Sequence, residues 1–175
     1  MTRIILVYGL VAGLVAILGI IGTILASSGS LWLGYLVMLV ALSAIVVGIK
    51  QHRDQALGGV IRFWPALLVG VGIAVVASVV YALVWEAYLA LTHYRYMDNY
   101  VESALAAKRA AGVTGAAYQK AAAGLEAMRQ MYRNPLYRLA TTAVEIFPVG
   151  LLVAVVSAAL LRNPRFLPAR VRATA

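Results

Sequence analysis

Cysteine is absent from this 175-residue chain, and charged residues are scarce. Without cysteine the chain has no disulfide, no thiolate nucleophile and no cysteine-based zinc site. The absence of cysteine does not decide in which cellular compartment the protein resides. Charged residues make up 12% of the chain and hydrophobic residues 63%, whereas a soluble domain is about a quarter charged. This composition excludes a water-soluble core and predicts one membrane domain over residues 1–175.

Acidic residues are rarer than basic ones. Six Asp and Glu stand against 15 Lys and Arg, which gives a net charge of +9. In a soluble protein this excess would suggest nucleic acid as a partner, but here the basic residues flank apolar runs, as in membrane proteins. No recognition helix or stacking platform accompanies them. We therefore expect the lipid bilayer as a partner and no nucleic acid.

Four apolar runs are long enough to cross a hydrocarbon core of about 30 Å at about 1.5 Å per helical residue. They cover residues 4–26, 31–49, 65–91 and 139–161. The first run could also be a signal peptide, but it is longer than the roughly 7–15 apolar residues of a signal sequence. The sequence therefore predicts an all-α, polytopic membrane protein with four transmembrane helices.

Small residues recur at helical spacing in these runs. Residues four apart lie on one helix face, and small side chains there let helices approach closely in lipid. The third and fourth runs each carry such a ladder, and the first has a shorter pair: Gly70, Ala74, Ser78 and Ala82; Gly150, Ala154 and Ala158; Gly9 and Gly13. These small residues could pack against other helices of the same bundle or against a second copy of the chain. The sequence therefore does not decide between a monomer and a homo-oligomer.

A short polar segment joins the second and third runs. It contains the pair Gly58 and Gly59, which permits a tight bend. His52 precedes this pair and has no second ligand three or four residues away. We therefore expect His52 to be a solvated loop residue and not a metal ligand or proton relay.

The one long polar segment covers residues 92–134 and has helical periodicity on both sides of a glycine-containing turn at 112–115. Its two apolar stripes are Met97, Tyr100, Val101, Ala104 and Leu105, then Tyr118, Ala121, Leu125, Met128 and Tyr132. The pattern predicts a helical hairpin between the third and fourth spans, packed on itself or on the membrane surface. The alternative is an arm that binds a partner.

Basic residues indicate the orientation, because cytoplasmic loops are enriched in Lys and Arg. With four spans both termini share one side, which carries Arg3, Lys50, Arg53, Arg62 and the basic tail at residues 162–175. The long insertion on the other side is itself basic, but its charges are spread over a longer segment. The tail contains Arg162, Arg165, Arg170 and Arg172, which could bind anionic lipid or simply set the topology; we favour the second reading. Both termini are thus expected in the cytoplasm, and the hairpin is expected to be extracytoplasmic.

Two carboxylates fall within the spans, Glu86 and Glu145, and helical rise places both in the outer leaflet. An ionisable residue at membrane depth is a candidate functional site. If the two share a site, one should stay protonated near neutral pH, as a proton- or cation-coupled translocator requires. The structural alternative pairs each carboxylate with a cation or hydroxyl at the base of the hairpin, from Arg95, Arg133, Arg138, Tyr88 or Tyr137.

Motifs for catalysis or cofactor binding are missing from the sequence. It contains no HExxH motif, no phosphate-binding glycine loop and no nucleophile with a base at helical spacing. The methionines of the apolar stripes are more typical of packing than of copper ligation. We expect no enzymatic activity, no cofactor and no metal site.

Several short segments, in this order, resemble the bacterial membrane protein family known as domain of unknown function 4199. They are Val47–Lys50 with Arg53-Asp54 and Gly58-Gly59, then Trp85-Glu86, Met131–Leu136 and Glu145–Leu151. The resemblance covers essentially the whole chain and implies a bacterial four-span protein of the cell membrane. It implies no activity, because the family has no established one.

These observations favour a structural, accessory or partner-binding protein of a bacterial inner membrane. Its partner would be another membrane protein or a second copy of the chain. The alternative is a small proton- or cation-coupled translocator that uses Glu86 and Glu145. The two readings differ in whether these carboxylates are neutralised by neighbouring groups.

Overall fold

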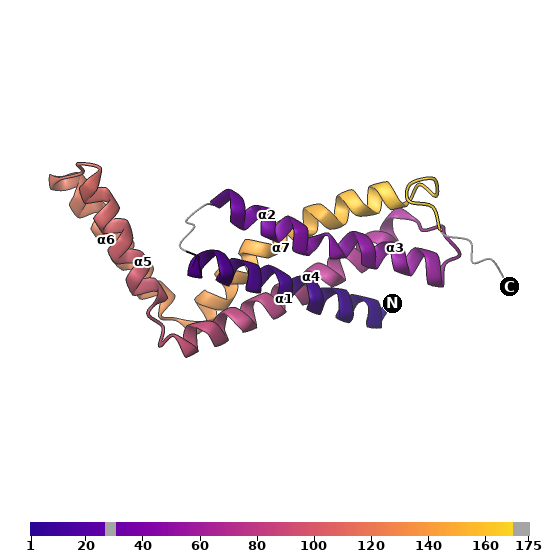
Figure 1. Ribbon diagram of the computed structural model, residues 1–175, viewed down its shortest axis with the longest axis horizontal. Helices are drawn as coiled ribbons and strands as arrows, with labels where there is room; N and C mark the ends of the chain where they lie inside the picture. The colour runs from indigo at the N-terminus through magenta and orange to yellow at the C-terminus, as the bar shows by residue number, and fades with distance from the viewer. Residues whose placement is uncertain (27–30, 170–175) are drawn as a thin grey trace. The chain divides into compact units, whose positions relative to one another are not determined.

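The computed structural model describes residues 1–26 and 31–169 and is all-helical over these ranges (Figure 1). The all-α prediction is therefore confirmed. The turn at residues 27–30, Arg170 and Arg172 lie outside the described residues. The helices are α1 (Thr2–Leu25), α2 (Leu31–Leu42), α3 (Ala44–Ala56), α4 (Phe63–Leu91), α5 (Tyr96–Ala110), α6 (Gly115–Tyr132) and α7 (Pro135–Leu161).

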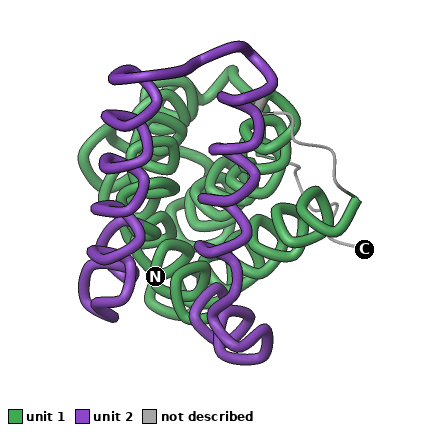
Figure 2. The backbone as a smooth tube through the Cα atoms, turned by 90° about the vertical axis from the view of Figure 1, so that its left-hand side faces the viewer, with its two compact units in different colours: residues 1–84, 142–175 green, residues 85–141 purple. Residues whose placement is uncertain are grey.

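The chain forms two compact units (Figure 2). The first, which we call the bundle unit, contains residues 1–84 and 142–175, and the second, the hairpin unit, contains residues 85–141. Helices α4 and α7 each contribute residues to both units. The hairpin unit is thus connected to the bundle unit by two continuous helices.

Four helical segments are long and apolar enough to cross a membrane: Thr2–Leu25, Trp32–Ala56, Phe63–Leu91 and Pro135–Leu161. The prediction of four helices able to span a membrane is therefore confirmed. The second segment consists of α2 and α3, which are separated at Ser43, where the hydroxyl donates a hydrogen bond to the Val40 carbonyl at 2.6 Å.

Helix α3 continues to Ala56, beyond the point where we expected the second span to end. His52 consequently lies on a helix with only 9% of its surface exposed, so the prediction of a solvated loop residue is wrong. An ion pair between Lys50 and Asp54, four residues apart on this helix, supports the continuation. The polar residues that suggested a loop are therefore part of the last turns of α3.

Small residues let the helices of the bundle unit approach closely. A Cβ atom added at Gly13 of α1 would lie 2.7 Å from the Ala77 carbonyl oxygen of α4. A Cβ atom at Gly70 would lie 2.8 Å from the Cβ of Ala154, and one at Gly150 would lie 2.9 Å from the Cβ of Ala74. The ladders of α4 and α7 therefore pack on each other within one chain.

Arg53 joins the end of α3 to the end of α7 and is completely buried. Its Nη1 donates to the carbonyl oxygens of Phe166 at 3.0 Å and Leu161 at 3.4 Å, and its Nη2 donates to that of Leu167. Its Nε donates to the neighbouring Asp54 carboxylate at 2.7 Å. Because the last carbonyls of a helix lack helical donors, Arg53 acts as a side-chain cap of α7. The sequence places Arg53 among the orientation signals and the family-like segments and does not predict this cap.

We predict that Gly13→Ala destabilises the protein by about 1–3 kcal/mol, because the added methyl group would overlap the backbone of α4. Gly22→Ala in the same helix is the matched control, since no atom lies within 4 Å of its Cβ position. The control should be neutral or slightly stabilising. Thermal unfolding in detergent measures both, and equal melting temperatures would contradict the close approach of α1 and α4.

Candidate functional site

Helices α5 and α6 form the predicted hairpin of the hairpin unit. They are joined by a turn in which Gly112 has a φ of +76°, and Gly115 at the start of α6 has a φ of +60°. Both values favour glycine. The helices bury little surface, because α5 buries Met97 and Val101 whereas α6 buries no residue. The apolar stripe of α6 is thus half-exposed, and Tyr100 of the first stripe is exposed.

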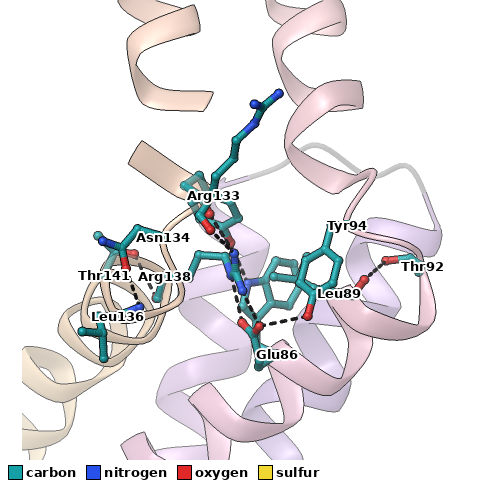
Figure 3. Close-up of polar contacts among 11 residues, drawn as sticks. Glu86, Leu89, Thr92, Tyr94, Arg133, Asn134, Leu136, Arg138 and Thr141 are labelled. Atoms are coloured by element: carbon teal, nitrogen blue, oxygen red, sulfur yellow. Dashed lines mark hydrogen bonds and ion pairs between the residues drawn. The ribbon is translucent and has the colours of Figure 1, made fainter. Parts of the chain in front are cut away.

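An ion pair between Glu86 of α4 and Arg138 of α7 lies at the base of this hairpin (Figure 3). Nε of Arg138 donates to Oε2 of Glu86 at 3.0 Å, and Nη2 donates to Oε1. This two-point geometry is the strongest form of an arginine–carboxylate contact. The side chain of Arg138 is 8% exposed and that of Glu86 is 25% exposed, so the pair is largely shielded from water.

Arg138 also binds the end of α6. Its Nη1 donates to the carbonyl oxygens of Tyr132 at 3.0 Å and Arg133 at 3.1 Å. These carbonyls lie at the C-terminal end of the helix, where no backbone N–H of the helix is available to bind them. The helix dipole also favours a cation at this end. One guanidinium therefore holds the ends of α4 and α6 to the first turn of α7.

Aromatic side chains surround this ion pair. The hydroxyl of Tyr94 donates to Oε1 of Glu86 at 3.3 Å, and the Tyr94 ring centroid is 4.9 Å from the Arg138 guanidinium carbon. Trp85 donates from Nε1 to the Tyr132 hydroxyl at 2.8 Å and stacks on Tyr88 at 5.3 Å between ring centroids. We define the Arg138 cluster as Trp85, Glu86, Tyr94, Tyr132 and Arg138.

The turn between α4 and α5 holds Tyr94 in this cluster at a conformational cost. His93 and Tyr94 have φ values of +53° and +56°, in the left-handed region that non-glycine residues rarely adopt. Such a residue costs about 1–2 kcal/mol. Strained backbone persists where the surrounding contacts determine it, and here those contacts are the bonds of Tyr94 to the ion pair.

Of the five residues predicted as partners of a carboxylate, the structure brings Arg138 to Glu86. Tyr88 instead stacks on Trp85, and Arg133 contributes only its carbonyl. Arg95 is exposed and Tyr137 is half-buried, and neither hydrogen-bonds to Glu86 within the described residues. Sequence reasoning missed Tyr94 and Tyr132, whose positions depend on the turn and on the end of α6.

Glu145 belongs to the bundle unit and has a different environment. Its side chain is exposed on α7, and it forms no hydrogen bond or ion pair with any described residue. Val144 beside it is 68% exposed. Leu152, which lies seven residues after Glu145 on the same face of α7, is 61% exposed. Glu145 therefore stands alone on an exposed apolar surface.

The described residues contain no group of three or more His, Asp or Glu side chains that could hold a metal ion. In the basic tail, Arg162 and Arg165 are exposed. Their position near the end of α7 fits either reading of the tail, as a topology signal or as a lipid contact.

We predict that Glu86→Gln destabilises the protein by about 3 kcal/mol, because it leaves the buried guanidinium of Arg138 without its counter-charge. Glu145→Gln is the matched control and should change stability by less than about 0.5 kcal/mol, since it removes no described contact. Denaturant titration compares the two, and hydrogen exchange should rise within residues 85–141 for Glu86→Gln alone. Equal losses in both variants would contradict the structural role of the pair.

Comparison with known proteins identifies a family. The family model described as "Protein of unknown function (DUF4199)" matches residues 7–163. Neither the curated proteins nor the solved structures gave a match. The matched range covers most of the chain and includes all four membrane-capable helices except the first residues of α1. The chain therefore belongs to the DUF4199 family of proteins of unknown function.

Proposed function

We propose that this protein is a non-catalytic, accessory protein of a bacterial inner membrane that presents its helical hairpin to a partner protein outside the cytoplasm. The observation that carries the proposal is the Arg138 cluster, in which the carboxylate of Glu86 is bound at two points by an arginine. A carboxylate held in this way ties α4 to α7 and is already neutralised by a neighbouring cation. The role of Glu86 in this proposal is to fix the base of the hairpin.

The surface of the hairpin supports a binding role. α6 buries no residue, and its apolar stripe from Tyr118 to Tyr132 is half-exposed along its whole length. Small side chains on the rest of α6, such as Ala123 and Ala127, are exposed and would let another helix approach closely. A hairpin with this little core of its own gains stability when a partner covers it. The partner would be another membrane protein or a second copy of the chain.

The distribution of charge supports the orientation. Arg53 binds the last carbonyl of α7, so the cations at the end of α3 and those after α7 lie at the same end of the bundle unit. That end carries Lys50, Arg53, Arg162 and Arg165. The positive-inside rule then assigns this end to the cytoplasm. The chain continues from α4 into the hairpin unit and returns through α7, so under this proposal the hairpin unit would lie outside the cytoplasm.

Single cysteines test the proposal directly, because the natural chain has none. Ala123→Cys places a thiol on the exposed face of α6, and Ala56→Cys, the matched control, places one at the exposed end of α3. In intact cells a membrane-impermeant benzophenone maleimide should label Ala123→Cys but not Ala56→Cys. After illumination, Ala123→Cys should give one discrete protein adduct, which mass spectrometry identifies as a second copy or another protein. Labelling of Ala56→Cys alone, or labelled Ala123→Cys without a protein adduct, would contradict the proposal.

The alternative is a proton- or cation-coupled translocator, and one observation favours it. Glu145 is a carboxylate without a described partner inside a membrane-capable helix, and such residues can mark ion pathways. Because Glu86 is neutralised by Arg138, Glu145 would have to act without it. Reconstituted protein should show no pH-dependent flux, in wild type or in Glu145→Gln. A flux that Glu145→Gln abolishes would favour the translocator over the accessory protein.

A further inference from the structure

A cavity of about 350 Å³ lies within the hairpin unit, at the base of α5 and α6. Small-molecule sites in proteins begin at about 300 Å³, so the cavity can hold a small ligand or a head group. Its cationic walls come from Arg129, Arg133 and Arg138, and its apolar and aromatic walls include Leu89, Met97 and Tyr132. The combination suits an anionic group attached to an apolar body.

Two of the three arginines already have carboxylate partners. Arg138 binds Glu86, and Arg129 lies 3.5 Å from Asp98, which also lines the cavity, and 3.0 Å from Glu126. These arginines contribute little uncompensated charge, although the buried Nε of Arg129 has no hydrogen-bond partner among the described residues. The guanidinium of Arg133 has no hydrogen-bond or ion-pair partner among the described residues. In Figure 3 it points away from the Glu86–Arg138 pair.

The free charge of Arg133 is therefore the one that a ligand can neutralise. A single unpaired guanidinium matches a singly charged anion and can bind two of its oxygens at once. Tyr94 also lines the cavity and is held by its bonds to the ion pair, so this wall is set before a ligand enters. A cavity with fixed walls loses less conformational entropy on binding.

The base of the hairpin lies at the level of a membrane surface. Glu86 is about 31 Å along α4 from Pro65, and Arg138 is about 35 Å along α7 from Leu161, against a hydrocarbon core of about 30 Å. Phospholipid phosphates occupy this level. This step uses the membrane placement proposed above, but it does not depend on which protein the hairpin contacts.

We propose that this cavity binds the phosphate group of an anionic phosphodiester, which at the membrane surface is the head group of a phospholipid, and that Arg133 is the residue that binds it. Leu89 and Met97 then contact the apolar part of the ligand. The site lies in the hairpin unit and is separate from the basic tail.

Native mass spectrometry of the full-length protein in detergent tests the site. The probes are phosphatidylglycerol, which is anionic, and phosphatidylcholine, which is zwitterionic. Wild type should bind phosphatidylglycerol several-fold more tightly than phosphatidylcholine. Arg133→Gln should weaken phosphatidylglycerol binding about tenfold, as expected for the loss of one charge-assisted contact. Arg133→Lys keeps the charge and should recover most of the affinity.

Lys108→Gln is the matched control, because it removes the same charge from an exposed position near the other end of the hairpin. It should leave phosphatidylglycerol binding within about twofold of wild type. Equal effects of Arg133→Gln and Lys108→Gln, or equal binding of the two lipids by wild type, would overturn the proposal. Thermal unfolding should show that Arg133→Gln is as stable as wild type, since the side chain has no described partner.

A competition experiment distinguishes the two sources of phosphate. Glycerophosphoglycerol, the soluble phosphodiester that remains when phosphatidylglycerol loses its acyl chains, should not displace phosphatidylglycerol at millimolar concentration if the ligand is a membrane lipid. Displacement that depends on Arg133 would show that the phosphate site exists but binds a soluble compound. That result would contradict the proposal that a membrane lipid occupies the site. Neither result bears on the protein partner of α6, which the cysteine experiment tests separately.

Discussion

The buried guanidinium of Arg138 is the constraint on which the hairpin unit depends. It binds the carboxylate of Glu86, caps the end of α6 and lies over the ring of Tyr94. A buried charge is tolerated when its partners satisfy it, and four of the five guanidinium donors are bound here. Because these partners come from α4, the end of α6 and the turn after α4, while Arg138 itself belongs to α7, removing either charge would loosen the whole base of the hairpin.

Arg53 plays the same part at the other end of α7. It too is buried, is paired with a carboxylate, that of Asp54, and donates to carbonyls at and beyond the end of a helix. In both places a cation meets the negative end of a helix dipole, where it is favoured. Apolar packing, exemplified by the contact between Gly70 and Ala154, holds the helices of the bundle unit between these points. The polar contacts determine which helix ends meet.

The sequence predicted the features that depend on local pattern. Run length predicted the four membrane-capable helices, and the spacing of apolar residues predicted the two helices of the hairpin. The sequence also indicated close helix approach through its small-residue ladders, but it left open whether they pack within one chain, as those of α4 and α7 do, or between two copies. It could not predict contacts between distant segments. Glu86 and Arg138 are 52 positions apart, and five residues were equally good candidates for the partner. The position of Tyr94 depends on a left-handed backbone that no glycine marks, and the burial of His52 depends on the continuation of α3.

A double-mutant cycle on Glu86 and Arg138 tests the central claim most directly. The stabilities of Glu86→Gln, Arg138→Gln and the double variant are compared with that of wild type. If the pair fixes the base of the hairpin, the double variant should lose less stability than the sum of the single losses, with a coupling of at least about 1.5 kcal/mol. Losses that add to within about 0.5 kcal/mol would show that the two residues act independently and would contradict the account.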